Sequence, residues 1–443
     1  MFARGAKLKE AREIAALGGP LVVNNLVQVG MQVTDTVMAG RLSGADLAAV
    51  AVGGAVFMPI FIFGLGVMMA LTPTIAQLHG AGRETEVGHW VRQGLWLALL
   101  VTVPTVVFVA NGAWVLHAFS VDPSIIPLAS GYMQALAFGV LPMYLYLAFR
   151  FFSEGTSETR PMMYISAVAL PLNVLFNWVF MYELGMGAVG CGVATAIVMG
   201  LMLCMMLANV QRRHYRQFEP FVRFDWLRPA DLRQLLWLGI PIGMTLFMEF
   251  SMFGAAALMM GSLGANIVAA HQIAVNFAAV MFMIPMGLSF AISVRIGRAI
   301  GRGDLPNARM SGMVGIQLCA AIMAVSAVLM LLFRQHIAGL YTNDPGVIAV
   351  ATGLLLMAAL FQLSDGIQAG ALGVLRGFKD TRASMVLTMI AYWGVGIPLA
   401  WWLGIRLNLG PAAVWVGLIA GLSVAAALLL WRFAYNTRHA RVD

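Results

Sequence analysis

The sequence predicts an all-α polytopic membrane protein with twelve transmembrane helices in two pseudo-symmetric six-helix bundles. Of its 443 residues, 61% are hydrophobic and only 10% are charged. Together with a mean hydropathy of +0.86, this composition excludes a water-soluble fold. Apolar runs long enough to cross a bilayer recur along the whole chain, and the second half of the chain repeats the first.

The apolar runs are interpreted as twelve membrane spans. A helix needs about 20 apolar residues to cross the hydrocarbon core, and several runs are longer, so we expect tilted helices. Prolines inside the runs lack a backbone N–H and should bend the helices. They are Pro20, Pro59, Pro104, Pro142, Pro241 and Pro285. The expected spans lie near residues 13–38, 47–77, 89–112, 124–151, 160–181, 187–210, 234–260, 266–297, 309–333, 345–375, 382–404 and 411–434.

Basic residues are distributed unevenly between the two sides of this topology. With both termini on one side, the loops and tails on that side carry 24 of the 27 lysines and arginines, which leaves Arg41, Arg334 and Arg406 for the other side. Because basic loops stay in the cytoplasm, this distribution predicts that both termini and the 211–233 loop are cytoplasmic. The net charge of +8 has the same origin, so we expect no nucleic-acid partner.

The two halves align when the second is shifted by 221 residues. We therefore expect an amino-terminal six-helix lobe over 1–210, a cytoplasmic linker over 211–233 and a carboxyl-terminal six-helix lobe over 234–443. An even number of spans in each copy gives both copies the same orientation, and transporters place substrate sites between such halves. The alignment pairs Pro20 with Pro241, Gly40 with Gly261 and Gly66 with Gly287.

The first expected span carries a polar stripe that ends in a carboxylate. At about 3.6 residues per turn, Asn25, Gln28, Gln32 and Asp35 fall on one face of the helix. A carboxylate inside a span is costly, so it usually faces a water-filled cavity or a bundle interior and marks an ion or substrate path. We interpret Asp35 as functional. The alternative is a structural hydrogen-bond partner within the bundle.

Few acidic residues lie inside the expected spans, and one span carries a pair of asparagines. Sixteen of the nineteen acidic residues are in loops, tails or helix ends, and the remaining three are Asp35, Glu249 and Asp365. On the fifth span, the segment PLNVLFNW places Asn173 and Asn177 one helical turn apart, so both side chains face the same way. Asparagines also join helices in ordinary packing, and for this pair both interpretations stay open.

Several function classes lack their sequence signatures. There is no G-x-x-x-x-G-K-[ST] phosphate loop, so ATP does not drive this chain directly. The absence of H-E-x-x-H and G-x-S-x-G argues against an intramembrane protease or lipase. No filter sequence or acidic ring indicates an ion channel, and a membrane-embedded transferase would need paired aspartates or a metal cluster. We expect a protein that is not an enzyme and has no cofactor.

Six segments spread over both halves carry a family resemblance: QVTDTVMAGRLSGADLAAVAVG, MALTPTIAQLHGAGR, PLNVLFNW, LFMEFSMF, SLGANIVAAHQIA and RGFKDTR. In them the chain resembles the NorM-type bacterial branch of the multidrug and toxic compound extrusion (MATE) family. The resemblance implies the MATE fold of the MOP superfamily, with two six-helix bundles forming a V around a central cavity. It also implies a monomeric antiporter of the bacterial inner membrane, surrounded by membrane lipids, that expels cationic amphipathic drugs and dyes in exchange for inward H+ or Na+.

The same resemblance implies roles for the polar residues of the first half. Asp35 with Asn173 and Asn177 corresponds to the family's amino-lobe site, where protonation and substrate binding are placed. Gln28 and Gln32, on the face of the first span that carries Asp35, are further candidates for this site.

In the second half, Glu249 and Asp365 correspond to the family's carboxyl-lobe cation site, and they would be the metal ligands if the ion is Na+. Phe361, one turn before Asp365, belongs to this site but offers no hydroxyl where a tyrosine is often found. This departure favours H+ over Na+. Pro20 resembles the bend point of the first span, and we expect it to act as a hinge.

One alternative comes from the same superfamily. A flippase for lipid-linked oligosaccharides should surround its cavity with arginine and lysine to meet a pyrophosphate. In this sequence the charges placed inside the spans are acidic. The sequence therefore favours efflux of organic cations over lipid flipping.

Overall fold

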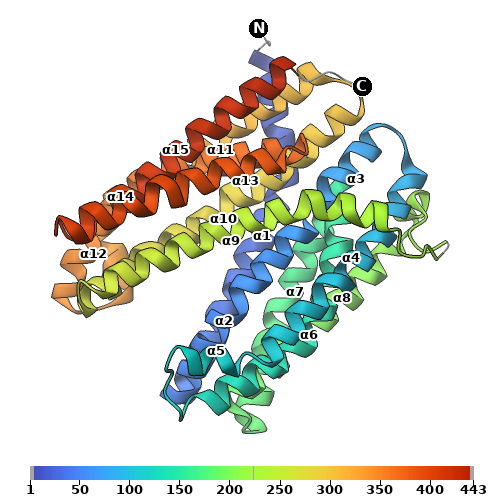
Figure 1. The fold of residues 1–443 in the computed structure, drawn as a ribbon. Coiled ribbons are helices and arrows are strands. Elements are labelled where there is room, and N and C mark those ends of the chain that lie inside the picture. The colour runs from blue at the N-terminus through green and yellow to red at the C-terminus, as the bar shows by residue number, and fades with distance from the viewer. Residues whose placement is uncertain (1–3, 223, 440–443) are drawn as a thin grey trace. The chain divides into compact units, whose positions relative to one another are not determined.

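The computed structural model describes residues 4–222 and 224–439, and nearly all of them are helical (Figure 1). Within this described part, 12 helical segments are long and apolar enough to cross a membrane. The predicted all-α fold with twelve spans is confirmed.

Contacts between residues group the helices into two units. Val23–Gly243 form one unit, here called the N unit. The residues up to Val22 and those from Met244 onward form the other, here called the C unit. Both boundaries fall inside helices, namely α1 (Arg4–Leu42) and α9 (Pro229–Gly261). The division into 1–210, 211–233 and 234–443 stays a prediction, and the units differ from it by placing the start of α1 with the second half.

In the N unit, α6 is the central helix and packs against α2, α3, α4 and α8. Small residues allow close approach, because a Cβ added to Gly139 of α6 would lie 2.8 Å from the Cα of Ala196 in α8. Figure 1 shows α4, α6 and α8 side by side. Besides parts of α1 and α9, the unit contains α2 (Gly44–Met68), α3 (Leu71–Gly80), α4 (Glu84–Ala110), α5 (Ala113–Ala118), α6 (Ile126–Gly155), α7 (Arg160–Asn177), the π-helix η1 (Trp178–Glu183), α8 (Gly187–Val210) and the 3-10 helix η2 (Arg213–Phe218).

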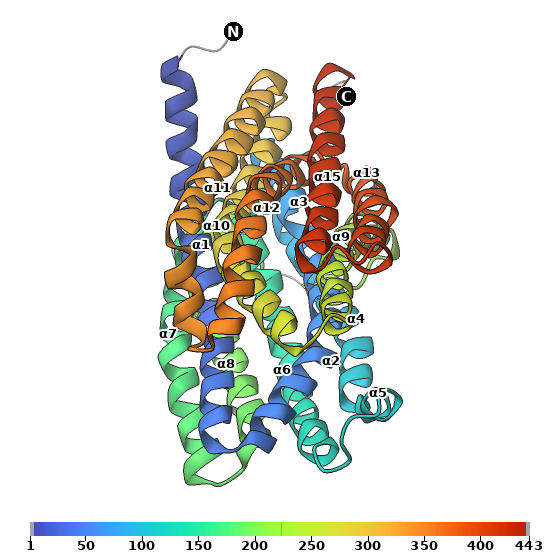
Figure 2. The same cartoon turned by 90° about the vertical axis from the view of Figure 1, so that its left-hand side faces the viewer.

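In the C unit, α10, α11 and α12 pack together, and α15 lies against α12 (Figure 2). Gly370 brings α12 close to α11, since an added Cβ would lie 3.0 Å from the Cα of Ile316. Besides parts of α1 and α9, the unit contains α10 (Ala265–Gly301), α11 (Leu305–Tyr341), α12 (Pro345–Gly377), α13 (Thr381–Met389), the π-helix η3 (Ile390–Gly396), α14 (Ile397–Trp401), the π-helix η4 (Trp402–Arg406) and α15 (Pro411–His439).

Three of the spans are less regular than predicted, and one of them, the fifth, changes from α7 to the π-helix η1. The second is interrupted at Met69 and Ala70, which separate α2 from α3. Pro73 explains the break, because it cannot donate the helical hydrogen bond to the carbonyl of Met69. The eleventh changes between α- and π-helix three times. The six predicted prolines all lie inside helices, and the prediction missed Pro171 in α7.

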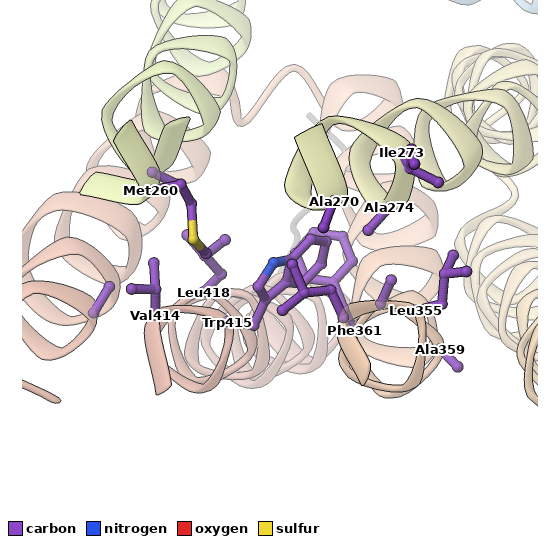
Figure 3. Packing of buried hydrophobic residues seen from close by; sticks show 14 of the residues in the cluster. Met260, Ala270, Ile273, Ala274, Leu355, Ala359, Phe361, Val414, Trp415 and Leu418 are labelled. Atoms are coloured by element: carbon purple, nitrogen blue, oxygen red, sulfur yellow. The ribbon is translucent and has the colours of Figure 1, made fainter. Parts of the chain in front are cut away.

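An aromatic cluster forms the core of the C unit beside the middle of α12. Trp415 of α15 is fully buried and meets both Phe361 of α12 and His271 of α10, with ring centroids 5.8 and 5.6 Å apart. Figure 3 shows Phe361 and Trp415 next to each other among aliphatic side chains such as Leu355 and Leu418. The cluster fixes α12 against its neighbours and thereby fixes the position of the residues one turn further along α12.

A buried ion pair fastens the start of α1 to the rest of the C unit. Arg295 of α10 donates through Nε and Nη2 to Glu10, over 2.9 and 2.5 Å, and its Nη1 meets Glu13 at 2.6 Å. The hydroxyl of Ser311 in α11 donates to Glu10 over 2.6 Å. The side chains of Glu10 and Arg295 are 4% and 17% exposed, so loss of the Glu10 charge would leave the guanidinium with the half-buried Glu13 as its remaining carboxylate partner among the described residues.

We therefore expect Glu10→Gln to lower the free energy of unfolding by about 3 kcal/mol, since breaking one partner of a buried pair has a cost of that size. The matched control is Glu86→Gln, which removes the equally bidentate but exposed pair with Arg83. Thermal unfolding of both variants in detergent checks this. Equal midpoints for the two variants would show that the buried pair contributes no more than the exposed one.

Candidate functional site

In the N unit, Asp35 is held by uncharged donors from two other helices. Asn177 and Asn173 of α7 donate from Nδ2 to its Oδ1 over 2.6 and 3.1 Å. Thr195 of α8 donates to Oδ2 over 3.4 Å, and the thiol of Cys191 also lies within hydrogen-bonding reach. Within the described part of the chain, no cationic side chain pairs with this carboxylate.

Asp35 and the two asparagines that bind it are buried. Asp35 is 9% exposed, and Asn173 and Asn177 are 1% and 0% exposed. The amide oxygen of Asn177 is also buried, and no described residue donates to it. A carboxylate and an amide oxygen thus lie side by side without a positive partner. A cation with N–H groups, or a proton, would satisfy both, because buried acceptors without donors are costly.

Local sequence explains how α7 presents its amides. Asn173 and Asn177 are four residues apart, so their side chains leave the helix on the same side. Asn177 is the last residue of α7, and the π-helix η1 follows directly. π-helical turns are rare in proteins, and those that do occur are often found at functional sites. The hydrogen bond from Ser166 of α7 to Asn24 joins α7 to α1 further along the same pair of helices.

Only part of the polar stripe of α1 lies at the Asp35 site. Asn25 and Asp35 are buried, whereas Gln32 is exposed and its amide nitrogen meets the sulfur of Met58 at 4.0 Å. The amide nitrogen of Gln28 is buried without a partner among the described residues. Neither glutamine bonds to Asp35 within that part of the chain, and their roles in substrate or proton binding stay predictions.

In the C unit, a second acidic site is built on α9 and α12. Gln368 of α12 donates from Nε2 to Oε1 of Glu249 in α9 over 3.4 Å. Asp365 is 4% exposed and lies near enough to Glu249 for their charges to interact. The hydroxyl of Tyr392 in η3 is buried beside both acids. The structure therefore brings Glu249 and Asp365 together, as the resemblance implies.

The donor atoms of this second site fit a proton or a monovalent cation. Two carboxylates lie near enough for their charges to interact, the amide oxygen of Gln368 has no hydrogen-bond partner among the described residues, and the hydroxyl of Tyr392 lies within reach of the Gln368 amide. Within the same residues, no group of three or more His, Cys, Asp or Glu side chains could hold a metal ion. Any Na+ bound here would have to use Glu249 and Asp365 together with these neutral oxygens.

The other two predicted site residues are Phe361 and Pro20. Phe361 lies inside the aromatic cluster, with Phe253 and Trp415 both at 5.8 Å, so it supports α12 by packing. Pro20 lies in α1 just before Val22, the last residue that groups with the C unit. Its role as a hinge stays a prediction.

If the asparagines stabilise a charged or proton-sharing Asp35, the loss of stability on removing one of them should depend on the carboxylate of Asp35. We expect Asn177→Ala to lower the free energy of unfolding by about 2 kcal/mol, the cost of leaving a buried acceptor without its donor. The loss should shrink by more than half in an Asp35→Asn background, which a double-mutant cycle measures. Gln32→Ala, on the exposed side of α1, is the control and should behave the same in both backgrounds. Additive effects of Asn177→Ala and Asp35→Asn would contradict this coupling.

Comparison with known proteins concerns the whole chain. The MatE family model matches residues 20–179 and 241–402. The multidrug resistance protein MdtK of Yersinia pseudotuberculosis is 41% identical over 440 residues, which cover 96% of this chain and 95% of that protein. MdtK of Yersinia enterocolitica is 40% identical over the same length.

Solved structures agree in fold. One is an outward-facing conformation of a multidrug resistance MATE family transporter of the MOP superfamily, with a TM-score of 0.90 at 19% identity, covering 97% of this chain and 96% of that one. Another is the eukaryotic MATE transporter AtDTX14, with a TM-score of 0.87 at 19% identity, covering 99% of this chain and 100% of that one. The chain therefore belongs to the MatE family of membrane transporters, which are not enzymes.

Proposed function

We propose that this chain is a secondary antiporter of the cytoplasmic membrane that expels amphipathic organic cations in exchange for inward H+ or Na+. The observation that carries the proposal is the buried Asp35 carboxylate, which neutral amides hold and no described cation neutralises. The 41% identity to a multidrug resistance protein supports the same substrate class. We keep the predicted orientation, with both termini cytoplasmic, as part of the proposal.

The arrangement gives exchange by competition. A carboxylate buried in a span is stable when it carries a proton or faces a cation, and costly when it carries neither. Asn173 and Asn177 keep the oxygens of Asp35 in place in both states, because an amide N–H donates to a carboxylate and to a carboxylic acid. Since a proton and an organic cation cannot both satisfy this carboxylate, arrival of one favours release of the other.

The second acidic site, Glu249 with Asp365, gives the coupling ion a further place to bind. A proton or cation between Glu249 and Asp365 removes the repulsion of two carboxylates that lie inside membrane spans. We propose H+ as the ion, because Phe361 is committed to the aromatic cluster and supplies no oxygen. The hydroxyl of Tyr392 and the amide oxygen of Gln368 are the neutral oxygens that Na+ could use, and the transport assay below separates the two ions.

Flipping of a lipid-linked oligosaccharide is the alternative in the same superfamily. A pyrophosphate needs arginine or lysine at its binding site. Both candidate sites are built on acidic residues instead, namely Asp35 in the N unit and Glu249 with Asp365 in the C unit. This polarity favours a cationic cargo.

Asp35→Asn keeps the size of the side chain and removes its charge. We expect the variant to lose resistance to monocationic drugs and dyes while keeping its expression level and its thermal unfolding midpoint nearly unchanged. Asp122→Asn, in a surface loop where Asp122 only caps Ser124, is the control and should keep full resistance. Full efflux by Asp35→Asn at normal expression would remove Asp35 from the mechanism.

Charge counting gives a second test. Exchange of one monocation for two protons moves one net charge inward, and at about 100 mV this adds roughly 2.3 kcal/mol. Because about 1.36 kcal/mol is a factor of ten, the drug gradient could be about 50-fold steeper. In liposomes, an imposed inside-negative potential should accelerate proton uptake and dye release.

The combined variant Glu249→Gln with Asp365→Asn should weaken this response, since it removes the second acidic site. No effect of membrane potential on wild-type transport would exclude exchange of two ions. A strict requirement for Na+ at constant pH would exclude H+ as the coupling ion.

A further inference from the structure

A cavity of about 550 Å³ opens beside the N-terminal end of α7, away from both acidic sites. Its walls come from the start of α7, the end of α8 and the 3-10 helix η2. These two helix ends adjoin the 211–233 loop, so the cavity lies at the end of the spans that the charge distribution places on the cytoplasmic side. Lipid headgroups occupy this depth of a membrane.

The cavity is basic at its mouth. Arg160 and Arg212 line it and are exposed, and no carboxylate of the described residues pairs with either. Glu158 also lines it, but this carboxylate meets Nε2 of His214 at 3.2 Å. The mouth of the cavity thus carries two arginines and one glutamate, and the glutamate is already paired. The site is therefore suited to an anion.

Below the arginines the walls become apolar. Tyr164 and Val168 follow Arg160 at intervals of four residues, so the three lie along one face of α7 over about 12 Å. On the antiparallel α8, Ala208 and Met205 line the cavity, and Arg212 lies two residues beyond the end of this helix. The two arginines thus lie at or just beyond the helix ends and the apolar residues lie further along the helices, as an amphipathic ligand with one anionic end requires.

The rim of the cavity is fixed by hydrogen bonds within the N unit. The hydroxyl of Tyr215 in η2 meets the hydroxyl of Ser153 at 2.5 Å and accepts a hydrogen bond from Asn209 over 3.3 Å. Tyr215 is 3% exposed and Asn209 is 8% exposed. This anchoring holds η2, which carries His214, against α6 and α8, so the cavity does not depend on a flexible loop for its shape.

The matching loop of the second half lacks this arrangement. The segment KDTR corresponds to SETR, which places Asp380 where the first half has Glu158. Asp380 accepts from Arg432 over 2.6 Å and from Asn436 over 2.7 Å. The basic residue of α15 is thereby neutralised, whereas the arginines of the first-half cavity are left for a ligand.

We propose that the cavity between α7 and α8 binds an anionic phospholipid, with the phosphate between Arg160 and Arg212 and an acyl chain along Val168 and Met205. The apolar wall distinguishes this ligand from a free phosphate, and the two arginines distinguish it from a zwitterionic lipid. This inference does not depend on the proposed transport function.

Native mass spectrometry of the purified full chain tests the site, with phosphatidylglycerol, phosphatidylcholine or inorganic phosphate as the added probe. We expect phosphatidylglycerol to be retained at lower concentration than phosphatidylcholine, and excess inorganic phosphate to leave its occupancy unchanged. In the double variant Arg160→Gln with Arg212→Gln, affinity for phosphatidylglycerol should fall about 25-fold, since each arginine near an anionic headgroup contributes roughly a factor of five. Arg213→Gln, the same change at a neighbouring residue that does not line the cavity, should bind like the wild type.

Val168→Trp tests the apolar wall without altering charge and should also weaken retention of phosphatidylglycerol. Circular dichroism and thermal unfolding check that each variant is folded. Equal retention of the two lipids, competition by inorganic phosphate, or full retention of phosphatidylglycerol by both altered proteins would overturn the proposal.

Discussion

The carboxylate of Asp35 is the group on which the account of this transporter depends. An unpaired charge inside a membrane span costs several kcal/mol, and the protein answers this cost with neutral donors instead of an arginine or lysine. Neutral donors stabilise the carboxylate but do not cancel its charge. The site is therefore preorganised and still needs a positive partner, and a proton and an organic cation are both suitable.

Near both acidic sites the helices depart from regular α-helical geometry. Asn177 sits where α7 changes to the π-helix η1, and Tyr392 lies inside the π-helix η3. A π-turn shifts the following residues around the helix axis and is less stable than an α-turn, so it persists where surrounding contacts determine it. In the C unit, Phe361 and Trp415 supply such contacts, because their cluster fixes α12 just before Asp365.

The sequence alone predicts the spans and the position of the three acids inside them, because hydropathy and charge are properties of single segments. Asp35, Glu249 and Asp365 stand out as carboxylates in apolar runs, and the spacing of Asn173 and Asn177 shows that they face one way. Thr195 and Tyr392 were missed, since Thr195 lies 160 residues from Asp35 and only the folded chain brings them together.

A polar face also need not be a single site: Gln32 shares a helix face with Asp35 by spacing, but the neighbouring helices leave it exposed. The break at Met69 and Ala70 was recognisable in principle from Pro73, whereas the π-helices depend on packing that no local pattern shows.

Proton release on substrate binding tests the central claim most directly. A monocationic dye is added to the purified protein in weakly buffered solution, across a pH series, and a pH indicator reports protons set free. If the dye and a proton compete for Asp35, about one proton should be released per dye bound at the acidic end of the series, and Asp35→Asn should release none. Stoichiometric dye binding without proton release at any pH, or unchanged release by Asp35→Asn, would contradict competition at this carboxylate.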